Sequence, residues 1–393
     1  GDRVYVPFGK KDKGYTAVVV SVHYNKPLEY DVKNIIDCPD SEPVFTPLQM
    51  TLLSWISSYY MAPQGDVVKC MLPSLLRDGD GATAKYKPKT VQYLRFGNMA
   101  FETGINLTGK QSGVFDCYKE ISGYNENGVE IVPISKKTLI EKSGTGDVPF
   151  KALIDKHILE YYSVQVGRLP EYDGPLVRPK MLSAAQNVAN NQIEHSFAQG
   201  KTCLLHGVTA SGKTEIYINL IRKTIDSGKQ ALFLLPEIAL TVQIMKRLQV
   251  VFGRDMIVYH SGINASERVE IWKKQLGNNP YKVVVGPRSA LMLPYTDLGL
   301  VIVDEEHDSS YKQADSSPRY NGRDCAIWLA RKCGANVLLG SATPSVESYY
   351  NALSGKYSLV ELTTRYSNID LPQIIVADMH ELYHKKIIRG YFS

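Results

Sequence analysis

The sequence predicts a multidomain α/β fold in which a small β-rich domain and a winged-helix module precede a RecA-like lobe with a parallel sheet. Three observations predict it. Short alternating strand patterns open the chain at residues 3–6 and 16–22. Three helical patterns followed by a strand pattern occupy residues 108–166. From residue 182 onward, short apolar runs alternate with helical patterns, which is typical of a parallel sheet covered on both faces.

The β-rich domain is expected to span residues 1–76. After its strands, apolar side chains recur at helical spacing, which predicts a helix around residues 48–60. Residues 77–107 open with two Asp-Gly pairs and few apolar side chains, so we expect a linker there.

The winged-helix module is expected at residues 108–168. Val114, Tyr118 and Ile121 form one apolar stripe, residues 134–142 form a second, and Asp147 begins a third helix. A strand at residues 161–166 follows. Winged-helix modules bind DNA in many proteins and serve as protein-contact domains in others, so the fold leaves both roles open. A second linker, residues 169–180, contains Gly174, Pro175 and Pro179.

The RecA-like lobe is expected to fill residues 181–393. Its predicted strands cover residues 202–206, 231–235, 256–259, 281–285, 300–303, 337–339 and 373–378. Such a series implies α/β units wound around one parallel sheet.

Composition and residue spacing argue against a membrane-spanning protein and against a C-x-x-C zinc or redox site. Lysine and arginine number 45 against 40 acidic residues, a mild excess that suits a polyanionic partner without requiring one. No apolar stretch has the length of a membrane span. The six cysteines form no C-x-x-C pair, which fits buried thiols in a reducing cytoplasm. Because the chain starts at Gly1 with a strand pattern, we expect that an upstream segment precedes it.

A nucleotide-binding loop is predicted at residues 207–214, which match G-x-x-x-x-G-K-[ST] between a strand and a helix. Backbone N–H groups of such a loop cradle phosphates at a helix N-terminus. We expect Lys213 to neutralise the β- and γ-phosphates of ATP and Thr214 to bind Mg²⁺. The alternative is a glycine-rich turn that carries a lysine by chance. The ATP-binding residues expected from this loop are Gly207, Thr209, Ser211, Gly212, Lys213, Thr214 and Glu215.

An acidic cluster strengthens the prediction of an NTPase. The apolar run at residues 300–303 delivers Asp304 and Glu305 to the carboxyl end of a strand, where ligands bind in open α/β sheets. We expect Asp304 to hold Mg²⁺ and Glu305 to orient or deprotonate the attacking water. A solvated acidic turn is the alternative.

Several short segments resemble superfamily 2 helicases. Residues 304–307 read DEEH and are similar to motif II, and residues 340–345 resemble motif III. In the latter, the resemblance implies that Ser341, Ala342 and Thr343 couple the nucleotide state to the grip on DNA. Residues 235–241 resemble motif Ia and residues 285–290 resemble motif Ib. Gln186 occupies the place of a glutamine that reads adenine, and its amide can pair with the adenine edge in two ways.

A closer resemblance, over essentially the whole chain, is to the PriA family of primosomal replication-restart helicases. The segments that carry it are VPFG at 6–9, SEPVF at 41–45, GVTASGKTE at 207–215, DEEHDSSYKQ at 304–313 and RYNGRD at 319–324. The resemblance implies an ATP-dependent 3′-to-5′ DNA helicase that recognises stalled or abandoned forks and initiates primosome assembly. It also implies a winged helix that contacts the parental duplex.

The resemblance implies DNA contacts in two regions. Gly9 and Lys33 would belong to a pocket for the 3′ end of a nascent strand, within a DNA-binding domain at residues 1–76. Near the nucleotide site, aromatic and cationic side chains alternate in a loop that would stack bases and hold phosphates. The DNA-binding residues expected in the lobe are His260, Arg288, Tyr311, Lys312, Arg319 and Tyr320. A packed surface loop is the alternative, and His260 fits a core histidine equally well.

The resemblance implies a second lobe, a zinc-binding insertion and a C-terminal domain in the full-length protein, and we expect none of these three within residues 1–393. We therefore expect zinc only in the full-length protein. We expect this chain to bind ATP, Mg²⁺ and fork DNA but to hydrolyse ATP weakly, since arginines of the second lobe complete the site.

The resemblance further implies forked and single-stranded DNA, single-stranded-DNA-binding protein and primosome components as partners. We expect a monomer in the bacterial cytoplasm, associated with the nucleoid and not with a membrane. Two alternatives remain: a double-strand DNA translocase, and a non-catalytic DNA-structure-binding module that uses ATP as a switch. Strand displacement would identify the helicase, and Glu305→Gln would leave a pure binding module unaffected.

Overall fold

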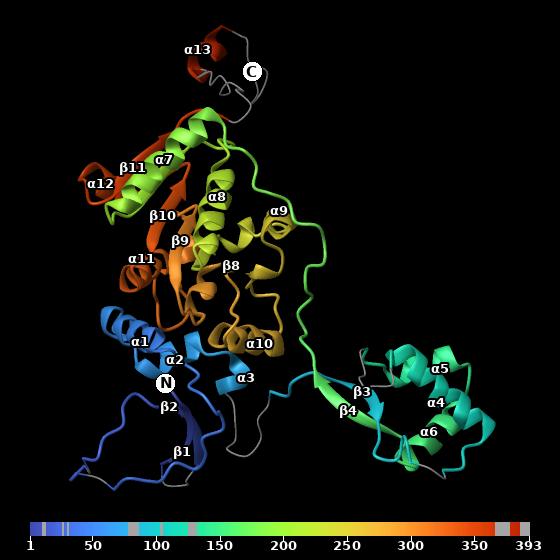
Figure 1. The fold of residues 1–393 in the computed structure, drawn as a ribbon. Coiled ribbons are helices and arrows are strands. Elements are labelled where there is room, and N and C mark those ends of the chain that lie inside the picture. The colour runs from blue at the N-terminus through green and yellow to red at the C-terminus, as the bar shows by residue number, and fades with distance from the viewer. Residues whose placement is uncertain are drawn as a thin grey trace.

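The computed structural model describes residues 1–9, 13–25, 27–29, 31–77, 86–102, 105–124, 132–365 and 378–385. Within this part, an N-terminal unit and a helical module lie at one end of a large α/β lobe (Figure 1). The lobe contains a seven-stranded sheet in which every pair of neighbouring strands is parallel. The predicted multidomain α/β fold is confirmed. None of the described helices is long and apolar enough to cross a membrane.

The N-terminal unit consists of a hairpin and three helices. Strands β1 (Arg3–Phe8) and β2 (Lys13–Val18) pair antiparallel. They precede α1 (Pro47–Tyr59), α2 (Gln64–Met71) and α3 (Ser74–Arg77). A capping box between Thr46 and Gln49 begins α1, close to the start expected from the apolar spacing. The helices α2 and α3 were not predicted, because each is too short to show a repeated apolar stripe.

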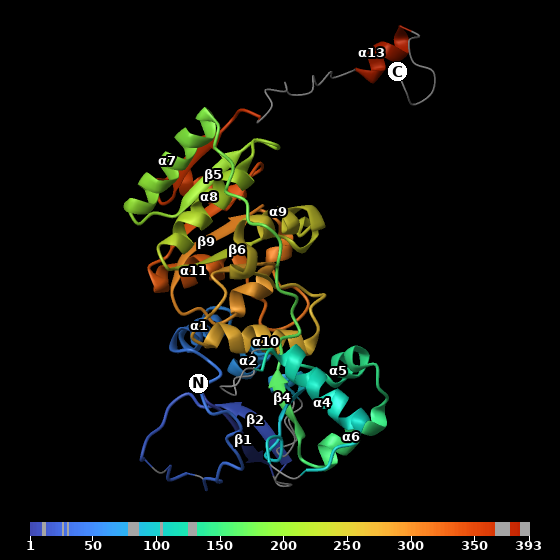
Figure 2. The same ribbon diagram turned by 45° about the vertical axis from the view of Figure 1, so that its right-hand side comes forward.

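These helices pack directly against the lobe. The Phe45 and Trp272 rings meet edge to face with centroids 5.7 Å apart, and the indole N–H of Trp272 donates to Val44 O at 2.9 Å. Trp55 stacks on Trp328 with centroids 4.7 Å apart. In Figure 2, α1, α2 and α10 (Ala265–Leu276) lie between the β1–β2 hairpin and the sheet of the lobe. The N-terminal helices and the lobe therefore share one hydrophobic core.

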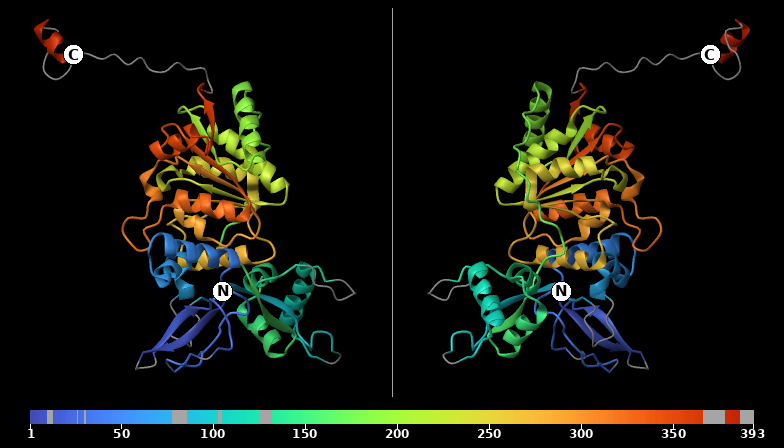
Figure 3. Two further views of the ribbon diagram at one scale, coloured as in Figure 1. Left: turned by 90° about the vertical axis from the view of Figure 1, so that its left-hand side faces the viewer. Right: turned by 90° about the vertical axis from the view of Figure 1, so that its right-hand side faces the viewer.

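The helical module has a core of its own. It contains α4 (Gly109–Ser122), α5 (Lys136–Ser143) and α6 (Asp147–Asp155). An antiparallel pair, β3 (Thr90–Phe96) and β4 (Leu159–Gln165), completes it. The prediction of a linker over residues 77–107 is wrong for β3, whose alternating pattern is short and whose partner lies far along the chain. Residues 78–85 of that segment lie outside the described residues. Figure 3 shows the module at the same end of the lobe as the β1–β2 hairpin, and Figure 1 shows the two apart.

The sheet of the lobe has the strand order β11-β5-β10-β9-β6-β8-β7. The strands are β5 (Cys203–Gly207), β6 (Gln230–Leu234), β7 (Met256–Val258), β8 (Val283–Gly286), β9 (Leu298–Asp304), β10 (Asn336–Ser341) and β11 (Ser358–Leu362). The edge strand β11 was not predicted. Of the strand expected at 373–378, only Asp378 is described, and it caps α13 (Met379–His384).

Helices cover both faces of this sheet. Side chains of α7 (Ala184–Ala198), α8 (Lys213–Asp226) and α9 (Val242–Phe252) belong to the core of one face. Those of α10, α11 (Gly322–Cys333) and α12 (Val346–Leu353) belong to the core of the other. Successive residues of β6 alternate between these two cores, so the strand is apolar throughout. The carboxyl ends of the neighbouring strands β5, β10 and β9 consequently meet at one edge, which is where the candidate site lies.

Candidate nucleotide-binding site

The predicted phosphate-binding loop connects β5 to α8. Its backbone enters the left-handed region twice, with φ of 62° at Ala210 and 81° at Gly212. Gly212 precedes α8, which begins at Lys213. A Cβ on Gly207 would lie only 3.0 Å from Ser211 Oγ and from the Lys213 side chain. Gly212 therefore permits the left-handed turn, and Gly207 lets neighbouring side chains approach the backbone closely.

Polar groups inside this loop favour an anionic ligand. The Lys213 ammonium donates to Gly207 O at 2.8 Å. Ser211 Oγ is buried and has no hydrogen-bond partner among the described residues. An unpaired buried hydroxyl is unfavourable, and it can donate to a ligand oxygen that enters the loop. The positive end of the α8 dipole adds to this preference for phosphate.

Gln186 supports the loop from α7. It closes a capping box with Ser183, and its side-chain nitrogen donates to Ser211 O and Gly212 O, each at 3.2 Å. The side chain is 1% exposed. In this structure Gln186 therefore positions the phosphate loop, and its contact with adenine stays a prediction.

Asp304 ends β9 directly opposite the phosphate loop. Its carboxylate accepts a hydrogen bond from the Tyr217 hydroxyl at 2.8 Å, and its backbone carbonyl accepts one from the Tyr311 hydroxyl at 2.7 Å. Burial raises the pKa of Asp304 to about 6, against the lowering effect of the Tyr217 hydrogen bond. A divalent cation would supply the positive charge that this carboxylate lacks.

The residues after Asp304 form a strained turn. Glu305 has φ of 45°, a left-handed conformation that costs a residue with a Cβ about 1 kcal/mol or more. The turn leaves the Glu305 side chain 37% exposed, beside the His307 ring at 3.7 Å. A strained residue at the mouth of a site fits a role in chemistry better than one in packing.

The predicted coupling motif lies beside this turn. His307 Nδ1 is 2.8 Å from Ser341 Oγ, and its Nε2 is 3.3 Å from Thr343 Oγ1. Thr343 N donates in turn to Ser341 Oγ at 2.9 Å. Ala342 lies between these two residues at the end of β10. His307 thus links the acidic turn to residues 341–343, a role that the sequence analysis did not assign to it.

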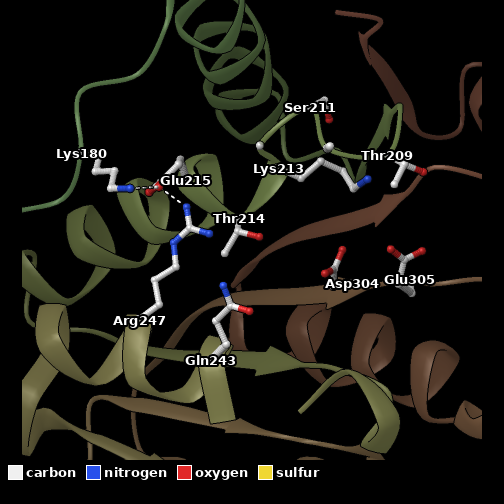
Figure 4. Close-up of a pocket in the computed structure, with 12 residues that line it drawn as sticks. Lys180, Thr209, Ser211, Lys213, Thr214, Glu215, Gln243, Arg247, Asp304 and Glu305 are labelled. Atoms are coloured by element: carbon white, nitrogen blue, oxygen red, sulfur yellow. Dashed lines mark hydrogen bonds and ion pairs between the residues drawn. The ribbon is translucent and has the colours of Figure 1, made fainter. Parts of the chain in front are cut away.

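A cavity of about 640 Å³ joins these groups, and Figure 4 shows the side chains around it. The predicted residues that line it are Thr209, Ser211, Gly212, Lys213, Thr214, Glu215, Asp304 and Glu305. Lys180, Gln243 and Arg247 also line it and were not predicted. Lys180 and Arg247 both pair with the buried Glu215. Their sequence signal is weak, because both lie outside the motif and reach it only through the fold.

Buried Glu306 fixes the other side of the turn. It pairs with Arg323 at 2.8 Å and accepts hydrogen bonds from Ser345 and Ser348. With four donor groups from three residues, this carboxylate ties the acidic turn to the starts of α11 and α12. Within the DEEH sequence, Asp304 and Glu305 therefore face the cavity, whereas Glu306 faces the interior.

The residues present fit ATP with Mg²⁺. The loop carries groups that can donate hydrogen bonds to phosphate. Thr214 and Asp304 both border the same cavity. Among the described residues, no group of three or more histidine, cysteine, aspartate or glutamate side chains is placed to bind a metal alone. Mg²⁺ in nucleotide sites typically has few protein ligands, and nucleotide phosphates and water supply the others.

The predicted DNA contacts of the lobe are only partly accessible. Tyr311 and Tyr320 are 2% and 1% exposed, so the prediction that they stack on bases is wrong for this conformation. Their rings fill the core shared with the N-terminal helices. Lys312 and Arg319 are exposed, as the prediction requires of phosphate contacts.

The remaining predicted contacts occupy loops. Arg288 is half-buried and donates to Ser310 O and Lys312 O, so it braces the loop after the acidic turn. His260 is half-buried and accepts from Gly262 N. In the N-terminal unit, the Lys33 ammonium donates to Gly9 O at 3.0 Å, which brings these two predicted residues together.

Comparisons with protein families divide the chain in the same order. Residues 1–73 match a model described as a 3′ DNA-binding domain (3′BD) of PriA. Residues 101–166 match the winged-helix domain of PriA helicase in Bacteroidota, and residues 184–352 match the DEAD/DEAH box helicase model.

Curated relatives extend over nearly the whole chain. The replication restart protein PriA of Chlamydia trachomatis serovar D is 32% identical, over 100% of this chain and 52% of its own length. That of Haemophilus influenzae is 35% identical, over 96% of this chain and 50% of its own. The chain thus spans about half the length of these relatives. A solved structure of RecG bound to a three-way DNA junction covers 47% of this chain and 24% of its own, at 23% identity and a TM-score of 0.35.

Proposed function

Because this chain belongs to the PriA family of replication restart proteins, we propose that its lobe is the first motor lobe of an ATP-dependent 3′-to-5′ DNA helicase. In the whole protein this motor recognises stalled or abandoned forks and initiates primosome assembly. The observation that carries the proposal is the alignment at one sheet edge of the phosphate loop, Asp304 and Ser341, on the adjacent strands β5, β9 and β10.

The residues at this edge have separable roles. Bound ATP with Mg²⁺ supplies the phosphoanhydride whose hydrolysis drives movement. Lys213 and the loop N–H groups neutralise the phosphates, and Thr214 and Asp304 hold the cation. Glu305 takes the proton of the attacking water, for which its exposure at the mouth of the cavity is suitable. Ser341 and Thr343, joined to the acidic turn through His307, report the state of the site to the DNA-binding surface.

DNA binds, in this proposal, at two places on the chain. The N-terminal unit takes the 3′ end of a nascent strand, with Gly9 and Lys33 at the pocket. Lys312 and Arg319 hold phosphates of single-stranded DNA near the lobe, while the winged-helix module contacts the parental duplex. The match of residues 1–73 to a 3′ DNA-binding domain supports the first assignment.

The proposal extends to the cellular setting. The protein acts as a monomer in the bacterial cytoplasm, with single-stranded-DNA-binding protein and primosome components as partners. This chain by itself binds ATP and fork DNA with little turnover, because in the family a second lobe completes the site. Robust DNA-stimulated hydrolysis by the isolated chain would contradict that statement.

The test of fork recognition compares two labelled forks whose nascent 3′ end carries either a hydroxyl or a phosphate. We expect the blocked fork to bind about tenfold more weakly, since the added group excludes the end from a fitted pocket. Lys33→Ala should remove this discrimination. Lys201→Ala, an exposed lysine before β5 at the opposite edge of the sheet, is the control. Equal binding of both forks by the unmodified chain would overturn the assignment of the pocket.

A further inference from the structure

Residues 311–321, which we call the bridge loop, connect the acidic turn to α11. The loop folds back on itself, with an isolated bridge between Lys312 and Asn321 and a hydrogen bond from Gln313 N to Tyr320 O at 2.9 Å. The Lys312 ammonium also donates to Arg319 O at 2.6 Å. The two strands of the loop are therefore held together, and a displacement of one end is transmitted to the other.

One end of the bridge loop is fastened to the nucleotide site. The Tyr311 hydroxyl donates to the backbone carbonyl of Asp304 at 2.7 Å, from a fully buried position. Arg288 donates to the carbonyls of Ser310 and Lys312 at 2.6 and 3.0 Å. A shift of this end must therefore move the backbone of Asp304 or break a buried hydrogen bond.

The other end is fastened to the N-terminal unit by Tyr60, the C-cap residue that follows α1. The Tyr60 hydroxyl accepts a hydrogen bond from Asn321 N at 3.1 Å. The Lys312 ammonium lies over the Tyr60 ring, 5.3 Å from its centroid, and Cys325 Sγ is 4.0 Å from the hydroxyl. A single side chain of the N-terminal unit thus contacts both strands of the loop.

Asn321, the residue whose backbone N–H contacts Tyr60, is also the cap of α11. Its side chain caps α11 by accepting from Arg323 N and Asp324 N, while its backbone N–H is the group that Tyr60 accepts. Arg323, two residues on, pairs with Glu306 of the acidic turn. Stacking of Trp55 on Trp328 holds α1 against the same helix, so Tyr60 is presented from a rigid support.

We propose that Tyr60 is a positioning residue that couples DNA binding by the N-terminal unit to nucleotide binding at Asp304. The chain of contacts runs from α1 through Tyr60 to the bridge loop and from Tyr311 to Asp304. This inference rests on the proposed function for the two binding sites, and it adds a residue of the N-terminal unit as the link between them. Because coupling is reciprocal, nucleotide binding strengthens DNA binding by the same factor as DNA strengthens nucleotide binding.

The test measures the dissociation constant of a fluorescent ATP analogue with Mg²⁺, first alone and then with saturating forked DNA. For the unmodified chain we expect a ratio between the two constants of at least about fivefold. Tyr60→Phe keeps the ring under Lys312 and removes the acceptor of Asn321 N–H. We expect it to bring the ratio close to one, with little change in the affinity for either ligand alone.

Tyr59→Phe is the matched control. Tyr59 is the preceding residue and the last of α1, is 63% exposed and stacks on Trp55, an interaction that phenylalanine retains. We expect this variant to keep the full ratio. Amide hydrogen exchange provides a second readout that does not depend on ligands: the amide of Asn321 should exchange faster in Tyr60→Phe and at the normal rate in Tyr59→Phe.

The outcomes separate the two proposals. If the unmodified chain binds both ligands but shows a ratio of one, or if Tyr60→Phe keeps the full ratio, the coupling role of Tyr60 is wrong while the binding sites stand. If the unmodified chain binds neither the ATP analogue nor forked DNA, the proposed function is wrong and the coupling role is wrong with it.

Discussion

Asp304, the proposed Mg²⁺ ligand, is held at a cost to the fold. Its carboxylate lies in a partly buried position between Tyr217 and the phosphate loop, and burial raises its pKa to about 6. On the neighbouring strand β10, a Cβ on Gly340 would come within 1.8 Å of the Tyr217 hydroxyl, so only glycine leaves room for the hydrogen bond to Asp304. Strained Glu305 follows. Such unfavourable features accumulate at sites that a ligand stabilises.

The first prediction concerns the pH dependence of this cost. The folded protein binds a proton on Asp304 more tightly than the unfolded chain does, since the pKa is about 6 in the fold and about 4 in the unfolded chain. The unfolding free energy therefore falls as the pH rises through this interval and is constant above it. Asp304→Asn should stabilise the ligand-free protein by about 1 to 3 kcal/mol at pH 7.5 and by little at pH 4.

Urea unfolding at the two pH values, without nucleotide or Mg²⁺, checks this prediction. Asp308→Asn is a control of opposite sign, because hydrogen bonds from Ser310 lower the pKa of Asp308. That variant should lose stability at pH 7.5, where the charged carboxylate is favourable, and the loss should shrink as the pH falls through the interval in which Asp308 becomes protonated. A gain for Asp304→Asn that is equal at both pH values would contradict the assigned cause.

Sequence reasoning at this scale identified the residues but not their environments. The spacing of Gly207, Lys213 and Thr214 follows from the requirements of phosphate binding, and the structure places Lys213 and Thr214 in one cavity with Asp304. The burial of Tyr311 and Tyr320 was not predictable, because the surface that covers them comes from helices more than two hundred residues earlier in the chain. The place of Arg247 at the cavity was not predictable either, because its partner Glu215 lies on another helix.

At the scale of elements, α11 connects most of the site. It begins at the end of the bridge loop with Asn321 as its cap, and its first turn carries Arg323. Arg323 pairs with the fully buried Glu306, so the helix fixes the acidic turn from behind. Ser345 and Ser348 at the start of α12 complete the hydrogen bonds of the same carboxylate. Two helices and one turn thus meet at a single buried charge.

The second prediction is that loss of the Arg323 cation, the partner of buried Glu306, destabilises the fold. Arg323→Met removes the cation and leaves the Glu306 carboxylate buried with only serine donors, which should lower the unfolding free energy by about 3 kcal/mol. Arg331→Met, on the exposed last turn of the same helix, should change it by less than about 0.5 kcal/mol. Urea unfolding of both variants measures the difference. Equal stability of the two would show that the ion pair is dispensable.

Element prediction succeeded where local sequence dominates. The strands β5, β6 and β9 are apolar because both faces are covered, and α4 carries the apolar stripe of Val114, Tyr118 and Ile121 from which it was predicted. It failed for β3, which was placed in a linker, and for β11, which was not foreseen. Both owe their place to a partner strand distant in the sequence, β4 and β5 respectively.

At the scale of the whole molecule, the nucleotide site and the N-terminal unit are parts of one packed body. Trp272 and Trp328 of the lobe receive Phe45 and Trp55 of the N-terminal unit, and Gln49 donates to Met292 O at 2.9 Å. The helical module α4–α6 instead has a separate core. A sequence divided into successive domains does not reveal this difference, since it depends on which apolar faces meet.

The central claim is that the carboxyl edge of the sheet binds ATP with Mg²⁺, and an equilibrium titration tests it most directly. A fluorescent ATP analogue would be added to the unmodified chain, to Lys213→Ala and to the control Lys201→Ala, each with and without Mg²⁺. We predict saturable, Mg²⁺-dependent binding to the unmodified chain and the control. We predict at least about tenfold weaker binding to Lys213→Ala, because a charge-assisted contact to phosphate is lost. Equal binding to all three proteins, or none to the unmodified chain, would contradict it.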